Sequence, residues 1–96
     1  MPSRKEYKDF ILEQLSLSGD ITFKPMMGEY LLYKSGVLFG GIYDDRLLVK
    51  ITANNAKYGL DKAVPYDGAK HMYLVDDLEN KEKLKDIVYD TYKDLK

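Results

Sequence analysis

The stretch that decides the fold runs from Ile21 to Thr52 and reads ITFKPMMGEYLLYKSGVLFGGIYDDRLLVKIT. Its side chains follow a period of two, which is typical of β-strands. Breaks at Gly28, Ser35-Gly36 and Asp44-Asp45-Arg46 have the residue types of tight turns. They delimit strands over residues 21–25, 29–34, 37–43 and 47–52. The sequence therefore predicts a meander of four antiparallel strands.

A helix is predicted before this stretch. Ser3 and Glu6 have capping-box spacing, in which each side chain satisfies a backbone donor of the first turn. The apolar face comprises Tyr7, Phe10, Ile11 and Leu15. The outer face comprises Lys5, Lys8, Asp9 and Glu13. Such a stripe predicts packing on the sheet.

The segment after the meander predicts further short elements. Thr52 can cap a short helix over 53–57 that Gly59 ends, and 65–68 has turn chemistry. A short fifth strand follows over 71–75. The last helix begins after Asp76, Asp77 or Asn80, and its inner face carries Leu84, Ile87, Val88, Thr91 and Leu95. The expected fold is α+β: one domain over residues 1–96, with a mostly antiparallel sheet and terminal helices.

Composition excludes several functions. The chain has 96 residues, 15 Lys and Arg, 16 Asp and Glu, one His and no Cys, so its formal net charge is −1. A balanced charge argues against strong direct binding of nucleic acid. Without Cys there is no disulfide, thiolate or zinc–sulfur site. No leader peptide or membrane span is visible, so we expect a cytoplasmic protein without a membrane role.

The residues that could carry chemistry have simpler explanations. Any nucleophile–base scheme must use His71, the single histidine, and a metal site would need it with Asp67, Asp76 or Asp77. Turn and cap roles account better for these carboxylates, and for the adjacent pair Asp44-Asp45. We therefore expect no catalysis, no metal and no cofactor.

Two glycine-containing segments remain. Gly40-Gly41 lacks the spacing of a phosphate-binding loop, and its position within a strand indicates a bulge or a close approach of another backbone or ring. Met26-Met27-Gly28 places flexible thioethers beside a backbone break, which suits either core filling or an adaptable contact surface.

The second and third strands carry apolar side chains on both faces. Strict alternation places Tyr30 and Leu32 opposite Leu31 and Tyr33. It likewise places Leu38 and Ile42 opposite Val37, Phe39 and Tyr43. The predicted helices cover one face, so the other requires loops or a partner, either a homodimer or another protein. The expected interface comprises Met26, Met27, Tyr30, Leu32, Leu38, Gly40, Gly41 and Ile42.

Four strings resemble the N-terminal domain of the TfoX/Sxy competence-regulator family. They are KPMMGEY (24–30), FGGIYDDRLLVK (39–50), PYDGAK (65–70) and LVDD (74–77). The resemblance covers essentially the whole chain. It implies an α+β fold grouped with secretion-chaperone-like domains, and a link to regulation of natural transformation, because the founding members activate competence genes.

The resemblance supplies no catalytic residues to carry over. Longer members have a second, helical C-terminal domain, and the sequence ends where the first domain would end, so a stand-alone copy need not regulate competence. The favoured function is a non-catalytic regulatory or protein-interaction module. The alternative is a binding module for a small ligand or peptide that uses the Met26-Met27-Gly28 region. A pocket of polar groups around His71 would favour ligand binding, and a flat apolar patch would favour protein interaction.

Overall fold

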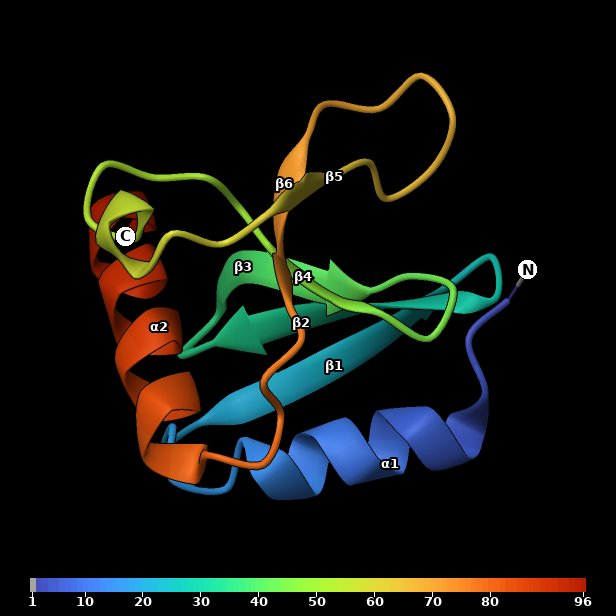
Figure 1. Cartoon of the computed structure of the whole chain (residues 1–96). Coiled ribbons are helices and arrows are strands. Elements are labelled where there is room, and N and C mark those ends of the chain that lie inside the picture. Colours follow the sequence, from blue (N-terminus) through green and yellow to red (C-terminus); the bar gives the residue numbers. More distant parts are fainter. Residues whose placement is uncertain (1) are drawn as a thin grey trace.

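The computed structural model describes residues 2–96 and confirms the α+β class (Figure 1). Residues 2–96 contain two helices, one 3₁₀ turn and six strands. The elements are α1 (Lys5–Gln14), β1 (Ile21–Met26), β2 (Glu29–Lys34), β3 (Val37–Ile42), β4 (Leu47–Val49), η1 (Ala56–Tyr58), β5 (Lys62–Ala63), β6 (Met72–Val75) and α2 (Lys81–Leu95).

The strands form one antiparallel sheet in the order β1-β2-β3-β4-β6-β5. The predicted meander over β1 to β4 is confirmed. Its first two hairpins turn at Met27-Gly28 and Ser35-Gly36, where both residues of each pair have positive φ. Such paired left-handed residues match the right-handed twist of the strands. The hairpin register is therefore determined locally.

Two strand predictions were wrong. The fourth strand ends at Val49 instead of Thr52. The backbone groups after Val49 form hydrogen bonds with the buried Asn55 side chain instead of continuing the strand. Its amide donates to the Lys50 carbonyl at 2.7 Å and its oxygen accepts from the Thr52 N–H at 2.9 Å. The short strand β5 was not predicted at all. Its two residues pair only with β6, which is too brief a pattern to show periodicity.

The first helix begins differently from the prediction. The capping box is wrong: the helix starts after Arg4 without a side-chain cap. Ser3 instead donates its hydroxyl to Glu29 at 2.8 Å and accepts from the Asp45 N–H at 3.1 Å. Ser3 thus attaches the N-terminal segment to the ends of β2 and β3.

The faces of α1 were also partly mispredicted. Phe10 is 38% exposed, whereas Lys8 is buried, with its ammonium 4.3 Å from the centre of the Phe23 ring and 2.7 Å from Asp9. Lys8 buries its aliphatic stem and keeps its charge satisfied by the carboxylate and the ring. Ile11 and Leu15 do enter the core as expected.

The later elements follow the sequence more closely. The short helix is a single 3₁₀ turn that ends at the left-handed Gly59, but Asn55, not Thr52, precedes it. Residues 65–68 form a turn in which the Ala69 N–H donates to the Tyr66 carbonyl. At the start of α2, Asn80 accepts a hydrogen bond from the Lys83 N–H at 3.0 Å, which is a regular N-cap.

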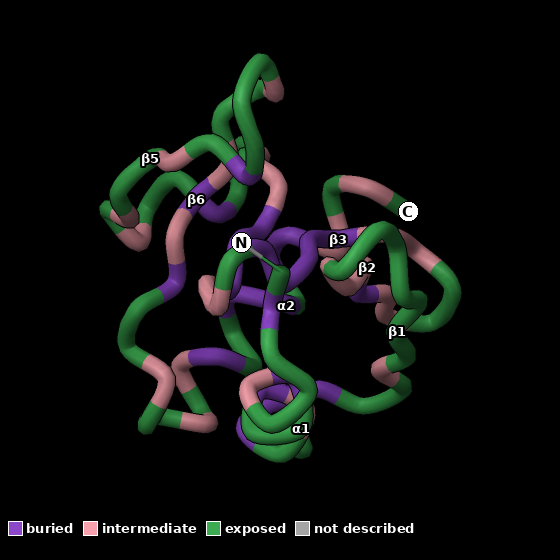
Figure 2. The backbone as a smooth tube through the Cα atoms, turned by 90° about the vertical axis from the view of Figure 1, so that its right-hand side faces the viewer, coloured by how far each residue is buried: buried purple, intermediate pink, exposed green. Residues whose placement is uncertain are grey.

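Both helices pack on the same face of the sheet. One cluster joins α1 and α2 to β2, β3, β4 and β6. Its buried members are Ile11, Leu15, Leu32, Phe39, Ile42, Leu47, Val49, Tyr73, Val75, Leu84, Ile87 and Val88. Figure 2 shows β3 mostly buried and β1 mostly exposed. We call the sheet face opposite the helices the open face.

Candidate functional site

The open face has a different composition from the sequence prediction because β3 contains a bulge. Leu32 pairs with Gly40 and Tyr33 with Leu38, so Phe39 is an extra residue between them. Phe39 and Ile42 therefore both lie in the core. The expectation that Leu38 and Ile42 share a face was wrong: Leu38 lies on the open face.

The glycine pair allows two close approaches within the chain itself. A Cβ on Gly40 would lie 2.2 Å from the Leu48 carbonyl oxygen, and a Cβ on Gly41 would lie 2.7 Å from the Tyr43 ring. The predicted bulge and close approach are confirmed, and the neighbouring backbone and ring belong to the same molecule. Leu48 and Tyr43 are consequently buried on the open face, outside the main core cluster.

The segment between β5 and β6, residues 64–71, projects on the side of the sheet away from α1 (Figure 1). Together with the open face it borders a cavity of about 540 Å³ that is partly open to solvent, and this volume falls within the range of small-molecule sites. Apolar side chains of Leu38, Ile51, Pro65 and Met72 line part of it. We call this space the loop cavity.

Arg46 attaches the 64–71 segment to the turn between β3 and β4. Its guanidinium donates to the Val64 carbonyl at 3.1 Å and the Pro65 carbonyl at 3.4 Å, and to the Tyr43 carbonyl at 3.2 Å. A planar group with several donors suits this role, because it can satisfy carbonyls of two segments at once. The start of the 64–71 segment is therefore held by hydrogen bonds, although residues 66–68 are exposed.

Two tyrosines form one wall of the loop cavity. The Tyr43 and Tyr66 ring centres are 6.3 Å apart with planes inclined by 54°. Tyr43 is buried and Tyr66 is largely exposed. Burial raises the pKa of Tyr43 above its usual value, and the neighbouring Tyr66, Glu29 and Tyr33 raise it further. Tyr43 is thus a neutral hydroxyl that can donate or accept a hydrogen bond.

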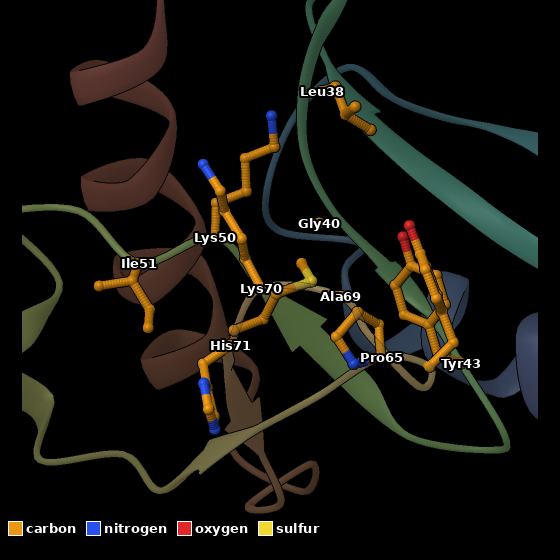
Figure 3. Close-up of a pocket in the computed structure, with 11 residues that line it drawn as sticks. Leu38, Gly40, Tyr43, Lys50, Ile51, Pro65, Ala69, Lys70 and His71 are labelled. Atoms are coloured by element: carbon orange, nitrogen blue, oxygen red, sulfur yellow. The ribbon is translucent and has the colours of Figure 1, made fainter.

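The polar groups of the loop cavity are basic. Lys50, Lys70 and His71 line it, and no Asp or Glu does. Figure 3 shows the Lys50 and Lys70 side chains extending toward the same side of the view, whereas the His71 ring points the opposite way. Within residues 2–96 none of these three side chains makes an ion pair or hydrogen bond. The cavity can therefore offer two unpaired cations beside an aromatic and apolar wall.

The predicted interface residues are divided between core and surface. Leu32 and Ile42 are fully buried against the helices, and Gly40 and Gly41 are buried under β4 and Tyr43. Leu32, Gly41 and Ile42 are therefore closed to a partner in the folded chain, whereas the buried Gly40 lines the loop cavity. Tyr30 packs half-buried against the core.

The remaining predicted positions are accessible. Met27 is 97% exposed at the β1–β2 turn and Met26 is 39% exposed beside it. Leu38 lines the loop cavity. Neither methionine nor Gly28 lines this cavity, so the structure does not bring the predicted ligand region into it.

The predicted carboxylate pairs serve structural roles. Asp45 accepts from the Arg4 N–H at 2.9 Å and forms an ion pair with its guanidinium at 2.7 Å, which lowers the pKa of Asp45. Asp77 lies 3.5 Å from the Lys83 ammonium. In the described chain, residues 2–96, no three His, Asp or Glu side chains are grouped to hold a metal ion.

The most perturbed carboxylate lies away from the cavity. Asp90 of α2 accepts from the Tyr58 hydroxyl at 2.6 Å and forms ion pairs with Lys57 and Lys93 at 3.0 Å. The Tyr58 hydrogen bond, with the two lysines, lowers the pKa of Asp90 to about 2. Burial and Asp90 together raise the pKa of Tyr58. These contacts attach η1 to α2.

Sequence reasoning missed Lys50, Lys70 and Tyr66 as site residues. Lys50 appeared as the polar member of an alternating strand, and the other two as parts of a turn. The 19 residues between the two lysines gave no local pattern. A usable signal was that 65–70 combines aromatic, basic and turn residues in a segment too polar for the core.

The fold and the site define a small α+β domain with a helix-covered face and a second face partly covered by a loop. The chain belongs to the TfoX N-terminal domain family, whose pattern it matches over residues 13–95. A search of curated proteins found no match. None of the helices in the described residues is long and apolar enough to span a membrane.

Proposed function

We propose that this protein is a non-catalytic regulatory module that acts by protein contact, in the control of competence genes or a related process. Membership of the TfoX N-terminal domain family supports a regulatory role. The observation that carries the contact mechanism is the apolar part of the open face over β1 to β3. There Met26, Leu31, Tyr33 and Leu38 remain partly or largely exposed.

The partner we assign to this face is a second copy of the chain. A net charge of −1 gives little repulsion between copies. Pairing the patch with itself about a two-fold axis is the commonest way to bury it. Pairing through the outer edge of the sheet is disfavoured, because β1 carries Lys24 and Pro25 there.

We expect a dimer of moderate strength, because the apolar patch comprises only four partly exposed side chains. A stable interface needs roughly 800 Å² from each partner, and the whole described surface is 5478 Å². The patch must therefore recruit neighbouring positions, of which the exposed Met27 at the hairpin tip is the most adaptable. We expect dissociation in the micromolar range.

Direct action on DNA is not part of the proposal. Seven lysines of the described chain already pair with carboxylates, so no continuous basic surface forms along a helix or strand. Specific duplex binding needs clustered cations that meet phosphates. Nanomolar binding of a native promoter fragment at physiological salt, with a steep salt dependence, would contradict this part of the proposal.

Sedimentation equilibrium from about 1 to 300 μM tests the dimer. Wild type should show a monomer–dimer equilibrium, and Leu31→Lys and Met26→Lys should each weaken it at least tenfold. The matched control is Leu17→Lys, because Leu17 is 45% exposed and follows α1, away from the patch. A wild-type monomer throughout the range, or equal weakening by the control, overturns the assignment.

The regulatory role has a separate test in the native host. Deleting the gene should alter transcript levels of competence genes. Wild type should restore them and Leu31→Lys should not, provided both proteins accumulate equally. Unchanged transcripts after deletion would refute the regulatory role whatever the oligomeric state.

A further inference from the structure

We propose that the loop cavity is a binding site for a small anionic molecule with a flat apolar body. Its anionic group would lie at Lys50 and Lys70, and its body would contact the wall formed by Tyr43, Leu38 and Met72. Leu38 borders both this site and the apolar patch over β1 to β3, but the site does not depend on the proposed regulatory role.

The first argument is the charge distribution. Acidic residues slightly outnumber basic ones in the chain, yet the cavity lining holds two lysines and the histidine without a carboxylate. Elsewhere in residues 2–96 lysines commonly have an acidic partner, as Lys5, Lys57 and Lys93 do. Two unpaired ammonium groups at one cavity repel each other, and a bound anion removes this repulsion.

The second argument is the shape and chemistry of the wall. The cavity, at about 540 Å³, accommodates a molecule of metabolite size. The Tyr43 ring is fixed on Gly41, so it presents a preorganised aromatic surface. In Figure 3 the Tyr43 hydroxyl points toward the same side of the view as the lysine side chains. The Tyr43 hydroxyl is neutral and can donate a hydrogen bond at its own wall of the cavity.

The third argument distinguishes a small anion from a nucleic-acid strand or an acidic peptide. Beyond Pro65 and Tyr66 lies a second hollow whose lining includes Glu29, Asp44 and Asp67. A polyanion leaving the loop cavity in that direction would meet these carboxylates. On the other side the open face continues through apolar Leu31 and Tyr33. The two lysines of the cavity are therefore bordered by carboxylates on one side and by apolar side chains on the other, and Lys24 lies beyond these on the edge strand β1.

The test is a titration of ¹⁵N-labelled full-length protein monitored by amide chemical shifts. The probes are benzoate and AMP, with benzyl alcohol as the neutral counterpart of benzoate and inorganic phosphate as an anion without an apolar body. Benzoate or AMP should shift the amides of residues 50, 51 and 69–72. Benzyl alcohol and phosphate should each bind at least tenfold more weakly. A preference between benzoate and AMP tells whether a carboxylate or a phosphate is the anionic group.

Variants identify the side chains. Lys50→Met and Lys70→Met should each reduce affinity about tenfold and leave the weak benzyl alcohol binding unchanged. Lys24→Met is the matched control, because Lys24 also lacks an ion pair in the described chain but lies on β1, outside the cavity. Far-UV circular dichroism verifies that each variant is folded.

Three results overturn the proposal. One is the absence of shifts at these amides with both anionic probes at 10 mM. Another is equal affinity of wild type and the two cavity variants. The last is binding of a single-stranded oligonucleotide or an acidic peptide at least a hundredfold tighter than AMP, with shifts extending over β1 and β2, which would make this a macromolecular surface.

Discussion

Replacing Gly40 with alanine should destabilise the protein far more than the same change at Gly36. A methyl group at Gly40 would lie 2.2 Å from the Leu48 carbonyl oxygen and 2.9 Å from the Val49 Cα. Both atoms belong to the backbone of β4, which β6 holds on its other side. No side-chain rotation can relieve this contact, so β4 must move away by about 1 Å.

The loss of stability can be worked out from the packing and the hydrogen bonds that this displacement of β4 would disrupt. Overpacking a well-filled site costs about 1–3 kcal/mol, and each ladder hydrogen bond lost between β3 and β4 adds about 1 kcal/mol. We therefore expect Gly40→Ala to lower the free energy of unfolding by about 3–5 kcal/mol. The total stability of a domain is only about 5–15 kcal/mol.

Gly36→Ala is the control that distinguishes the steric overlap at Gly40 from the conformational effect of replacing a glycine. Gly36 has φ of +82° in the β2–β3 turn, and a Cβ there would meet nothing within 4 Å. Replacing it with alanine lowers the free energy of unfolding only by the strain of a left-handed alanine, about 1–2 kcal/mol. Urea unfolding followed by circular dichroism measures both variants. Losses of similar size at the two positions would refute the close packing of β3 on β4.

Three further outcomes follow from the polar contacts of α2. Because the pKa of Asp90 is lowered to about 2, its ionised form stabilises the fold above pH 4, and stability should fall as the pH decreases from 4 to 2. In the Asp90→Asn variant, the thermal-unfolding temperature should change less over this pH range. Tyr58→Phe should cost about 1–2 kcal/mol in urea unfolding at pH 7, through loss of its 2.6 Å bond to Asp90. Asn55→Ala should cost about 3 kcal/mol and raise hydrogen exchange at Thr52, since Asn55 bonds the Lys50 carbonyl, the Thr52 N–H and Thr91.

Locally encoded features of the fold were predictable from the sequence. The two hairpins depend on glycines that tolerate positive φ, and these are visible in the sequence as Gly28 and Gly36. The face of α2 depends on a helical repeat long enough to be unambiguous, and its predicted residues Leu84, Ile87 and Val88 are buried. Such signals require no knowledge of distant partners.

Features that depend on distant partners were not predictable. Ser3 was assigned to the helix that follows it, but its hydroxyl bonds to Glu29, 26 residues away. Lys8 was assigned to solvent, but its ammonium lies over the Phe23 ring. The bulge at Phe39 leaves β3 intact but exchanges the two faces of the sheet for the residues after it. Strict alternation therefore assigned the later side chains of β3 to the wrong faces.

The loop cavity shows why the candidate site has no sequence motif. Gly40 and Gly41 admit β4 and the Tyr43 ring beside it, and Arg46 holds the Val64 and Pro65 carbonyls at the start of the segment that borders it. These are backbone and packing features, which any strand and loop can contain. The basic side chains then come from separate elements that the sheet brings together. A site assembled in this way is recognised by which charges lack partners in the folded chain, and this property appears only in three dimensions.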